Sequence, residues 1–132
     1  MGLTIALTRY DRHVPFFNGT VTAAKGFELT PLEVGESNNQ RDGTHRHARM
    51  LKNREFDIAE MSMSSWMMAV ARDPDLSLVG IPVFPRRFFS IGQIYVNAEA
   101  GIREPKDLIG RKVGLHSFQT TLSLLAKGDL KF

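Results

Sequence analysis

The sequence predicts an α/β fold with a mainly parallel sheet. Two observations support this prediction. Short apolar runs typical of buried strands alternate with segments of helical periodicity, and polar side chains directly follow several of these runs. In folds of this class, ligands lie beyond the carboxyl ends of the strands, next to helix N-termini. The polar side chains at the strand ends are therefore the first candidates for a functional site.

The first third of the chain contains two predicted strands and a short helix. Leu3–Leu7 (LTIAL) is an uninterrupted apolar run, the pattern of a strand buried on both faces. Val14–Val21 is predicted to hold a short helix, since Pro15 is tolerated in a first helical turn. Phe27–Val34 alternates apolar and polar residues like a strand, and Pro31 favours an edge position for it.

The middle of the chain is predicted to be loop, helix, strand and helix. After a polar loop over Glu36–Gly43, Thr44 is the expected N-cap of a helix over His45–Arg54. Asp57–Glu60 is a third predicted strand. Ser62–Arg72 is predicted to be a helix because apolar side chains recur there three and four residues apart, at Met63, Trp66, Met67 and Val70.

The last part of the chain is predicted to add three strands and one helix. Leu76–Phe84 and Phe89–Val96 are apolar enough for a fourth and a fifth strand. A polar connector over Gly101–Gly110 leads to a further strand over Lys112–Leu115. A helix is expected over Thr121–Lys127.

Composition indicates a globular protein without thiol chemistry. Hydrophobic residues make up 42% of the chain, there is no cysteine, and the net charge is +3. The one basic cluster, Arg41–Arg54, is predicted to be a solvated helix face, so we expect no nucleic-acid binding. His45 and His47 are two residues apart and do not share a helical face, which argues against a metal pair.

The N-terminal segment is predicted to be a strand and not a signal peptide. MGLTIALTRYD reaches Arg9 and Asp11 after an apolar run too short for the core of a signal peptide. No segment approaches the length of a membrane span. We therefore expect a cytoplasmic protein without membrane insertion, provided that no upstream leader has been removed.

Arg9 and Tyr10 end the first predicted strand. Arg9 could hold a substrate carboxylate through two parallel hydrogen bonds, and Tyr10 could stack on an aromatic ring. The alternative is an exposed loop with a surface ion pair. The residues alone do not decide between these interpretations.

Glu60, Ser62 and Ser64 lie where the third predicted strand changes to helix. Glu60 is a candidate pocket carboxylate for proton transfer, with apolar neighbours at Met61 and Met63; the alternative is a structural acid that caps the next helix. Ser62 and Ser64 are predicted to bind a ligand, because free N–H groups at a helix start attract anions. Ordinary capping is the alternative for both serines. No nucleophile elbow, P-loop or dinucleotide-binding glycine pattern is present, so no cofactor is expected.

Four segments together resemble a known family. They are TRYDRHVPFFNGTV, FDIAEMSMSSWMM, IPVFPRRFFSIGQIYVN and GIREPKDLIGRKVGLHSFQTT. This set is similar to the 4,5-dihydroxyphthalate decarboxylase family, with FDIAEMSMSS followed by IPVFPRR as the more specific part. The resemblance implies a type II periplasmic-binding-protein fold, in which two lobes surround a cleft. Solute-binding proteins for nitrate, sulfonate and thiamine precursors share that fold.

The resemblance also implies a domain organisation. Because the family's proteins are more than twice as long, we expect an N-terminal fragment or a truncated gene product that is inactive alone. Residues 2–100 would form most of lobe one, and residues 101–132 the crossover with the first strand and helix of lobe two.

The same resemblance extends the candidate site into the last third of the chain. Arg87 matches the family's arginine after Pro-x and would be a second anion clamp, with a solvated turn as the alternative. His116, at the carboxyl end of the predicted lobe-two strand, could be an acid or a base. Hydrogen-bond donors from the second wall would be Ser117, Gln119 and Thr120.

The implied reaction is the cofactor-independent decarboxylation of a dihydroxylated aromatic diacid. Arginines would orient the carboxylates, and Glu60 or His116 would supply the proton to the ring carbon. The partner would thus be a small aromatic or organic anion, and the sequence leaves a homo-oligomer open. One alternative is a solute-binding protein of an ABC-type transporter that closes on a small organic anion. Another is an inert remnant with an exposed sheet edge.

Overall fold

The computed structural model describes residues 1–35, 45–87 and 89–131, and the chain divides into two compact units. The first unit is Met1–Leu78 and the second is Val79–Phe132. The division within the chain thus follows Leu78. The lobe boundary expected after Ala100 concerns the longer two-lobed fold and stays a prediction.

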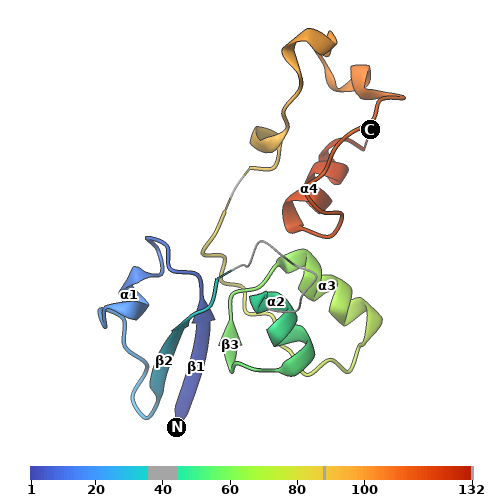
Figure 1. Ribbon diagram of the computed structural model, residues 1–132. Helices are drawn as coiled ribbons and strands as arrows, with labels where there is room; N and C mark the ends of the chain where they lie inside the picture. The colour runs from blue at the N-terminus through green and yellow to red at the C-terminus, as the bar shows by residue number, and fades with distance from the viewer. Residues whose placement is uncertain (36–44, 88, 132) are drawn as a thin grey trace. The chain divides into compact units, whose positions relative to one another are not determined.

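The first unit is built on a three-stranded parallel sheet. The strands β1 (Gly2–Leu7), β2 (Glu28–Glu33) and β3 (Ile58–Ala59) lie in the order β2-β1-β3 (Figure 1). Both pairings of β1 are parallel, with Ile5 opposite Pro31 on one side and Ile58 on the other. The α/β class, the parallel sheet and the edge position of the strand that contains Pro31 are therefore confirmed.

The core of the first unit lies around the end of the central strand. Ile5, Ala6 and Leu7 are buried, as the apolar run predicted for a strand covered on both faces. Ala6 packs in a cluster with Met50 and Phe56, which come from the helical segment before β3 and from the turn into it. Burial of these apolar side chains holds the helical segment before β3 against the central strand β1.

Asp57 links β3 to β1 through hydrogen bonds with Thr4. Its Oδ2 accepts hydrogen bonds of 2.8 Å from both the backbone N–H and the hydroxyl of Thr4, and its own N–H donates to the Thr4 hydroxyl. These bonds lower the pKa of Asp57. The short strand β3 therefore has side-chain support in addition to its two paired residues.

The helices of the first unit follow the predicted order. α1 (Val14–Phe17) is shorter than predicted, and α2 (Arg46–Ala48) continues into a π-helical turn over Arg49–Asn53. His45 caps α2 by accepting the His47 N–H. The predicted cap at Thr44 and loop over Glu36–Gly43 lie outside the described residues. α3 (Met63–Arg72) has Ser62 as its N-cap, so the predicted helix is confirmed.

In its described residues, the second unit contains one α-helix and several short 3-10 turns. α4 (Thr121–Asp129) agrees with the predicted helix. The strands predicted over Leu76–Phe84, Phe89–Val96 and Lys112–Leu115 are wrong, because no strand lies in the described part of these segments. An apolar run becomes a strand only when a neighbour pairs its backbone N–H and C=O groups. The described residues of this unit supply no such neighbour.

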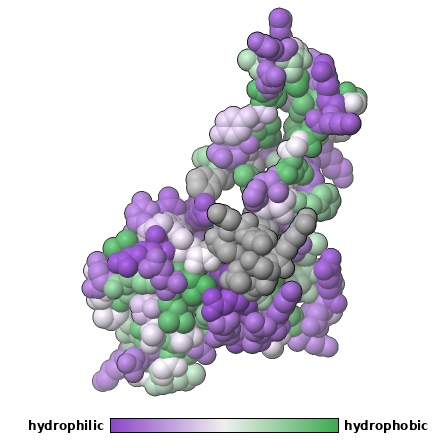
Figure 2. All heavy atoms as spheres, viewed as in Figure 1, coloured by the Kyte–Doolittle hydropathy of each residue, from purple (hydrophilic) through white to green (hydrophobic). Residues whose placement is uncertain are grey.

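Many apolar side chains of the second unit are in contact with solvent. Phe89 is 91% exposed, Val79 90% and Ile109 84%. In Figure 2, hydrophobic residues lie at the surface among hydrophilic ones. Within the described ranges, no helix is both long and apolar enough to cross a membrane.

Candidate functional site

Arg46 joins the carboxyl ends of all three strands. Its Nη1 donates to the Thr8 hydroxyl, just after β1, at 2.6 Å and to the carbonyl of Val34, just after β2. Its Nε donates to the carbonyl of Glu60, just after β3, at 2.8 Å. A single guanidinium at the start of α2 therefore holds together the edge of the sheet at which ligands bind in this fold class.

Glu60 forms a buried salt bridge with the same guanidinium. Its Oε2 lies 2.9 Å from Nη2 of Arg46, and the two side chains are 13% and 0% exposed. The backbone N–H of Glu60 donates to the carbonyl of Ala6, which continues the pairing of β3 with β1. Both the backbone and the carboxylate of Glu60 are thus fixed relative to the sheet.

The burial of Arg46 corrects the prediction for the basic cluster. A solvated helix face was expected over Arg41–Arg54, and this is wrong for Arg46, which has no exposed surface. One sequence signal was present. Arg46 lies four residues before the buried Met50 and therefore on the same helical face. Charge alone had assigned it to the solvent side.

Tyr10 lies beside this salt bridge and is held by His13. The Tyr10 hydroxyl donates to Oε1 of Glu60 over 3.4 Å, a long hydrogen bond, and the Tyr10 and His13 rings lie 4.1 Å apart between centroids. The buried His13 contacts the carbonyl of Thr8 through Nδ1 at 2.9 Å. Because a carbonyl only accepts, Nδ1 of His13 carries the proton.

Arg9 makes different contacts. Its guanidinium pairs with Glu33 over 3.4 Å, with both side chains more than half exposed, and lies over the ring of Phe17. This is the surface ion pair considered as the alternative for Arg9. Tyr10 and Glu60 are therefore brought together, whereas Arg9 pairs with the end of β2. A role for Arg9 as an anion clamp stays a prediction.

The serines after β3 form the start of α3. The Ser62 hydroxyl accepts the N–H of Ser65 and lies 3.1 Å from the hydroxyl of Ser64, which is 1% exposed. Ser62 is thus an N-cap, two residues beyond Glu60. Ligand binding by Ser62 and Ser64 stays a prediction, to which the capping geometry adds a structural role.

His45 and His47 flank Arg46 at the start of α2. Their rings lie 4.3 Å apart between centroids, and His45 is buried. Burial, together with the neighbouring charges of His45 and Arg46, lowers the pKa of His47 to about 3. Among the described residues, no group of three or more His, Asp or Glu side chains could hold a metal ion.

The pKa of His47 predicts a loss of stability in acid. The unfolded chain protonates His47 below its ordinary pKa of 6.5, whereas the folded chain keeps it neutral down to about 3. The unfolded state thus binds more protons in this window. The free energy of unfolding should therefore decrease as the pH is lowered, by at most about 1.4 kcal/mol per pH unit. Urea unfolding between pH 7 and pH 4 measures it. His47→Gln should flatten the slope, and an unchanged slope in that variant would contradict the prediction.

The remaining predicted site residues belong to the second unit. Arg87 is exposed, with Nε donating to the carbonyl of Phe84, and His116 is also exposed. The Ser117 hydroxyl accepts the N–H of Gln119 at 3.5 Å. Thr120 caps α4, and its hydroxyl accepts the N–H of Ser123. Their predicted contacts with a ligand stay predictions.

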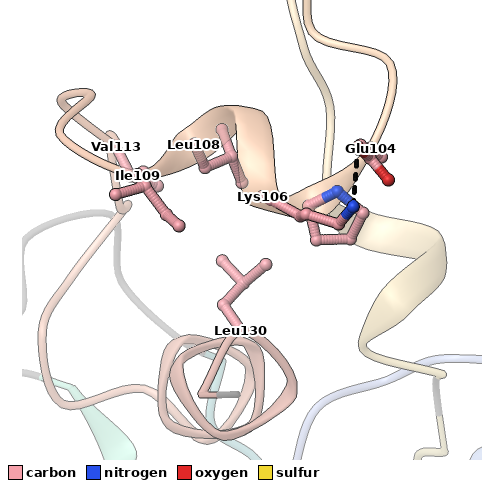
Figure 3. A pocket seen from close by; sticks show the side chains of 7 residues that line it. Glu104, Lys106, Leu108, Ile109, Val113 and Leu130 are labelled. Carbon is pink, nitrogen blue, oxygen red and sulfur yellow. Dashed lines mark ion pairs between the residues drawn. The ribbon is translucent and has the colours of Figure 1, made fainter.

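An apolar hollow of about 710 Å³ lies within the second unit. Leu130, at the end of α4, points toward Leu108 and Ile109, and the ion pair of Glu104 with Lys106 lies at the edge (Figure 3). Its lining contains none of the predicted site residues. An apolar lining does not suit a dianion, so this hollow is not the candidate site.

Together, the fold and the contacts of Arg46 with Thr8 and Glu60 define an α/β protein in which polar groups gather at the carboxyl ends of the strands of a parallel sheet. Searched against protein-family models, the chain matches none. It is similar, however, to a 4,5-dihydroxyphthalate decarboxylase of Comamonas testosteroni, with 30% identity over 122 residues. It is also similar to a 4,5-dihydroxyphthalate decarboxylase of Pseudomonas putida, with 30% identity over 124 residues.

The similarity covers most of this chain and a smaller part of each relative. The aligned regions are 92% and 94% of this chain, but 34% of the Comamonas testosteroni protein and 45% of the Pseudomonas putida protein. The chain therefore spans less than half of the length of these curated relatives.

Proposed function

We propose that this chain belongs to the 4,5-dihydroxyphthalate decarboxylase family and that the intact protein decarboxylates a dihydroxylated aromatic diacid. The observation that carries the proposal is the similarity to two proteins of that name over 92% and 94% of the chain. The cluster of Tyr10, Arg46 and Glu60 supports it, because polar groups gather at the strand ends where this fold class binds ligands. The proposal includes the two-lobed type II periplasmic-binding-protein fold.

The reaction exchanges one ring carboxylate for a proton. The ring hydroxyl para to the departing carboxylate first loses its proton. This places electron density on the ring carbon that carries the carboxylate. That carbon takes a proton, the C–C bond breaks, and its electron pair returns to the ring as carbon dioxide leaves. The hydroxyl then regains its proton, so the net change consumes one proton from solvent and yields a dihydroxybenzoate.

Glu60 is suited to the first of these proton transfers. Its Oε2 is bound to Arg46, whereas Oε1 accepts only a long bond from Tyr10 among its described contacts. A carboxylate oxygen accepts more than one hydrogen bond, so Oε1 has capacity for a ring hydroxyl. We therefore propose that Glu60 accepts the hydroxyl proton as a general base and later returns it.

The other predicted contributions remain part of the proposal. Arg9 and Arg87 would hold the carboxylates, and Ser62, Ser64, Ser117, Gln119 and Thr120 would donate hydrogen bonds. His116 would protonate the ring carbon. The reaction would proceed without an organic cofactor, in the cytoplasm.

The test is a direct assay of the intact gene product with 4,5-dihydroxyphthalate, following carbon dioxide release and dihydroxybenzoate formation. Phthalate is the matched control, because it has both carboxylates but lacks the hydroxyls that make the ring electron-rich. We expect turnover of the first compound only. Binding of both compounds without carbon dioxide release would contradict the proposal and favour a solute-binding protein.

A further inference from the structure

We propose that Arg46 is a positioning residue for this reaction: it holds the Glu60 carboxylate in its reactive orientation and compensates its charge. The inference rests on the proposed function and deepens it. Arg46 itself would not touch the substrate. Its Nε, Nη1 and Nη2 all donate to protein acceptors, namely the carbonyls of Glu60 and Val34, the Thr8 hydroxyl and the Glu60 carboxylate.

The first step of the argument is geometric. Arg46 binds Glu60 twice, through Nε to the backbone carbonyl and through Nη2 to Oε2. These two bonds fix the backbone and the carboxylate of Glu60, and the bonds from Nη1 to Thr8 and Val34 fix the guanidinium to the residues that directly follow β1 and β2. Oε1 is thereby left as the carboxylate oxygen toward which Tyr10, and by our proposal the ring hydroxyl, is directed.

The second step is electrostatic. The proposed substrate carries two carboxylates, and an uncompensated Glu60 beside it would repel it. A buried guanidinium 2.9 Å from Glu60 makes the pair neutral overall while leaving Oε1 able to accept a hydrogen bond. The pair therefore does not repel a dianion as an isolated carboxylate would, and Oε1 can still accept a hydrogen bond from the ring hydroxyl.

A second ion pair in the same part of the chain provides a matched control. Arg49 also pairs with a glutamate, Glu55, through two bonds, but the side chains are 31% and 39% exposed. This pair has the same chemistry and lies within a few residues of Arg46. In the described contacts, it joins no strand end and does not contact Tyr10 or Glu60.

The experiment is a double-mutant cycle on the intact gene product with 4,5-dihydroxyphthalate. Arg46→Met should lower kcat about 30-fold in the wild-type background and should also raise KM, because Glu60 then lacks its counter-charge and repels the dianion. In the Glu60→Gln background, the same replacement should lower kcat less than about 3-fold, because the carboxylate that Arg46 positions is already absent. Arg49→Met should leave kcat within about 2-fold of the wild type.

Folding is controlled in the same measurements. Each kcat is divided by the folded fraction from circular dichroism, because Arg46→Met leaves an unpaired buried carboxylate. Arg46→Lys is the second variant: it keeps the positive charge but cannot reproduce the fork of donors, so kcat should again fall with little change in KM.

The outcomes separate the two proposals. Turnover by the wild type with equal losses from Arg46→Met in both backgrounds would overturn the positioning role alone. A loss for Arg49→Met as large as that for Arg46→Met would do the same. Absence of wild-type turnover would overturn the proposed function, and this inference with it.

Discussion

Arg46→Met is expected to lower the free energy of unfolding by about 3–5 kcal/mol. Methionine keeps much of the side-chain volume but leaves the Glu60 carboxylate, only 13% exposed, without its counter-ion. It also removes the donors for the Thr8 hydroxyl and for the carbonyls of Val34 and Glu60. Buried polar groups that lose their partner pay the full cost of desolvation. Urea unfolding at neutral pH, followed by circular dichroism, measures the change.

Two controls make this result specific to the buried pair. Arg49→Met breaks the solvent-accessible pair with Glu55 and should cost much less than Arg46→Met. Adding Glu60→Leu to Arg46→Met should recover the part of the loss that comes from the uncompensated carboxylate, whereas the Thr8 hydroxyl and the two carbonyls still lack their donor. Equal losses for Arg46→Met and Arg49→Met would show that the three strand ends do not depend on Arg46.

Glu60→Gln is expected to reduce kcat by about 10²- to 10⁴-fold while binding of the aromatic diacid changes little. Glutamine has nearly the same shape, and its side-chain carbonyl can still accept from Arg46, but it does not take up a proton at neutral pH. The measurements are kcat for 4,5-dihydroxyphthalate and the Kd of phthalate by calorimetry, both on the intact gene product.

The control for Glu60→Gln is Glu33→Gln. Glu33 is exposed and pairs with Arg9 at the end of β2, so its replacement tests whether any loss of a carboxylate at the sheet edge has the same effect. We expect kcat of the Glu33 variant to stay near the wild-type value. Turnover retained in Glu60→Gln would remove Glu60 from the mechanism.

Local patterns explain which parts of the structure could be predicted. The apolar run of β1, the alternation of β2 and the helical period of α3 each lie within a few consecutive residues. The cap of α3 at Ser62 is equally local. Predictions that depended on a pairing strand distant in the sequence were wrong. Phe89–Val96 and Lys112–Leu115 have apolar patterns, but no strand forms in their described residues.

The candidate site was predictable in part. Strand-end positions pointed to Tyr10 and Glu60, which do lie together, and also to Arg9, which pairs with Glu33. The position of a residue at a strand end does not determine the direction in which a long, flexible side chain points. A nearby carboxylate on the neighbouring strand was enough to give Arg9 a different partner.

The sequence by itself determined the α/β class, the parallel sheet, the edge strand and the placement of Glu60 at a strand-to-helix junction. Only the tertiary structure decided that Arg46 is buried and central. Its acceptors lie 38 residues away at Thr8, 12 at Val34 and 14 at Glu60. A charged side chain can be buried only where such acceptors converge, and their convergence is a property of the folded sheet and not of any local stretch of residues.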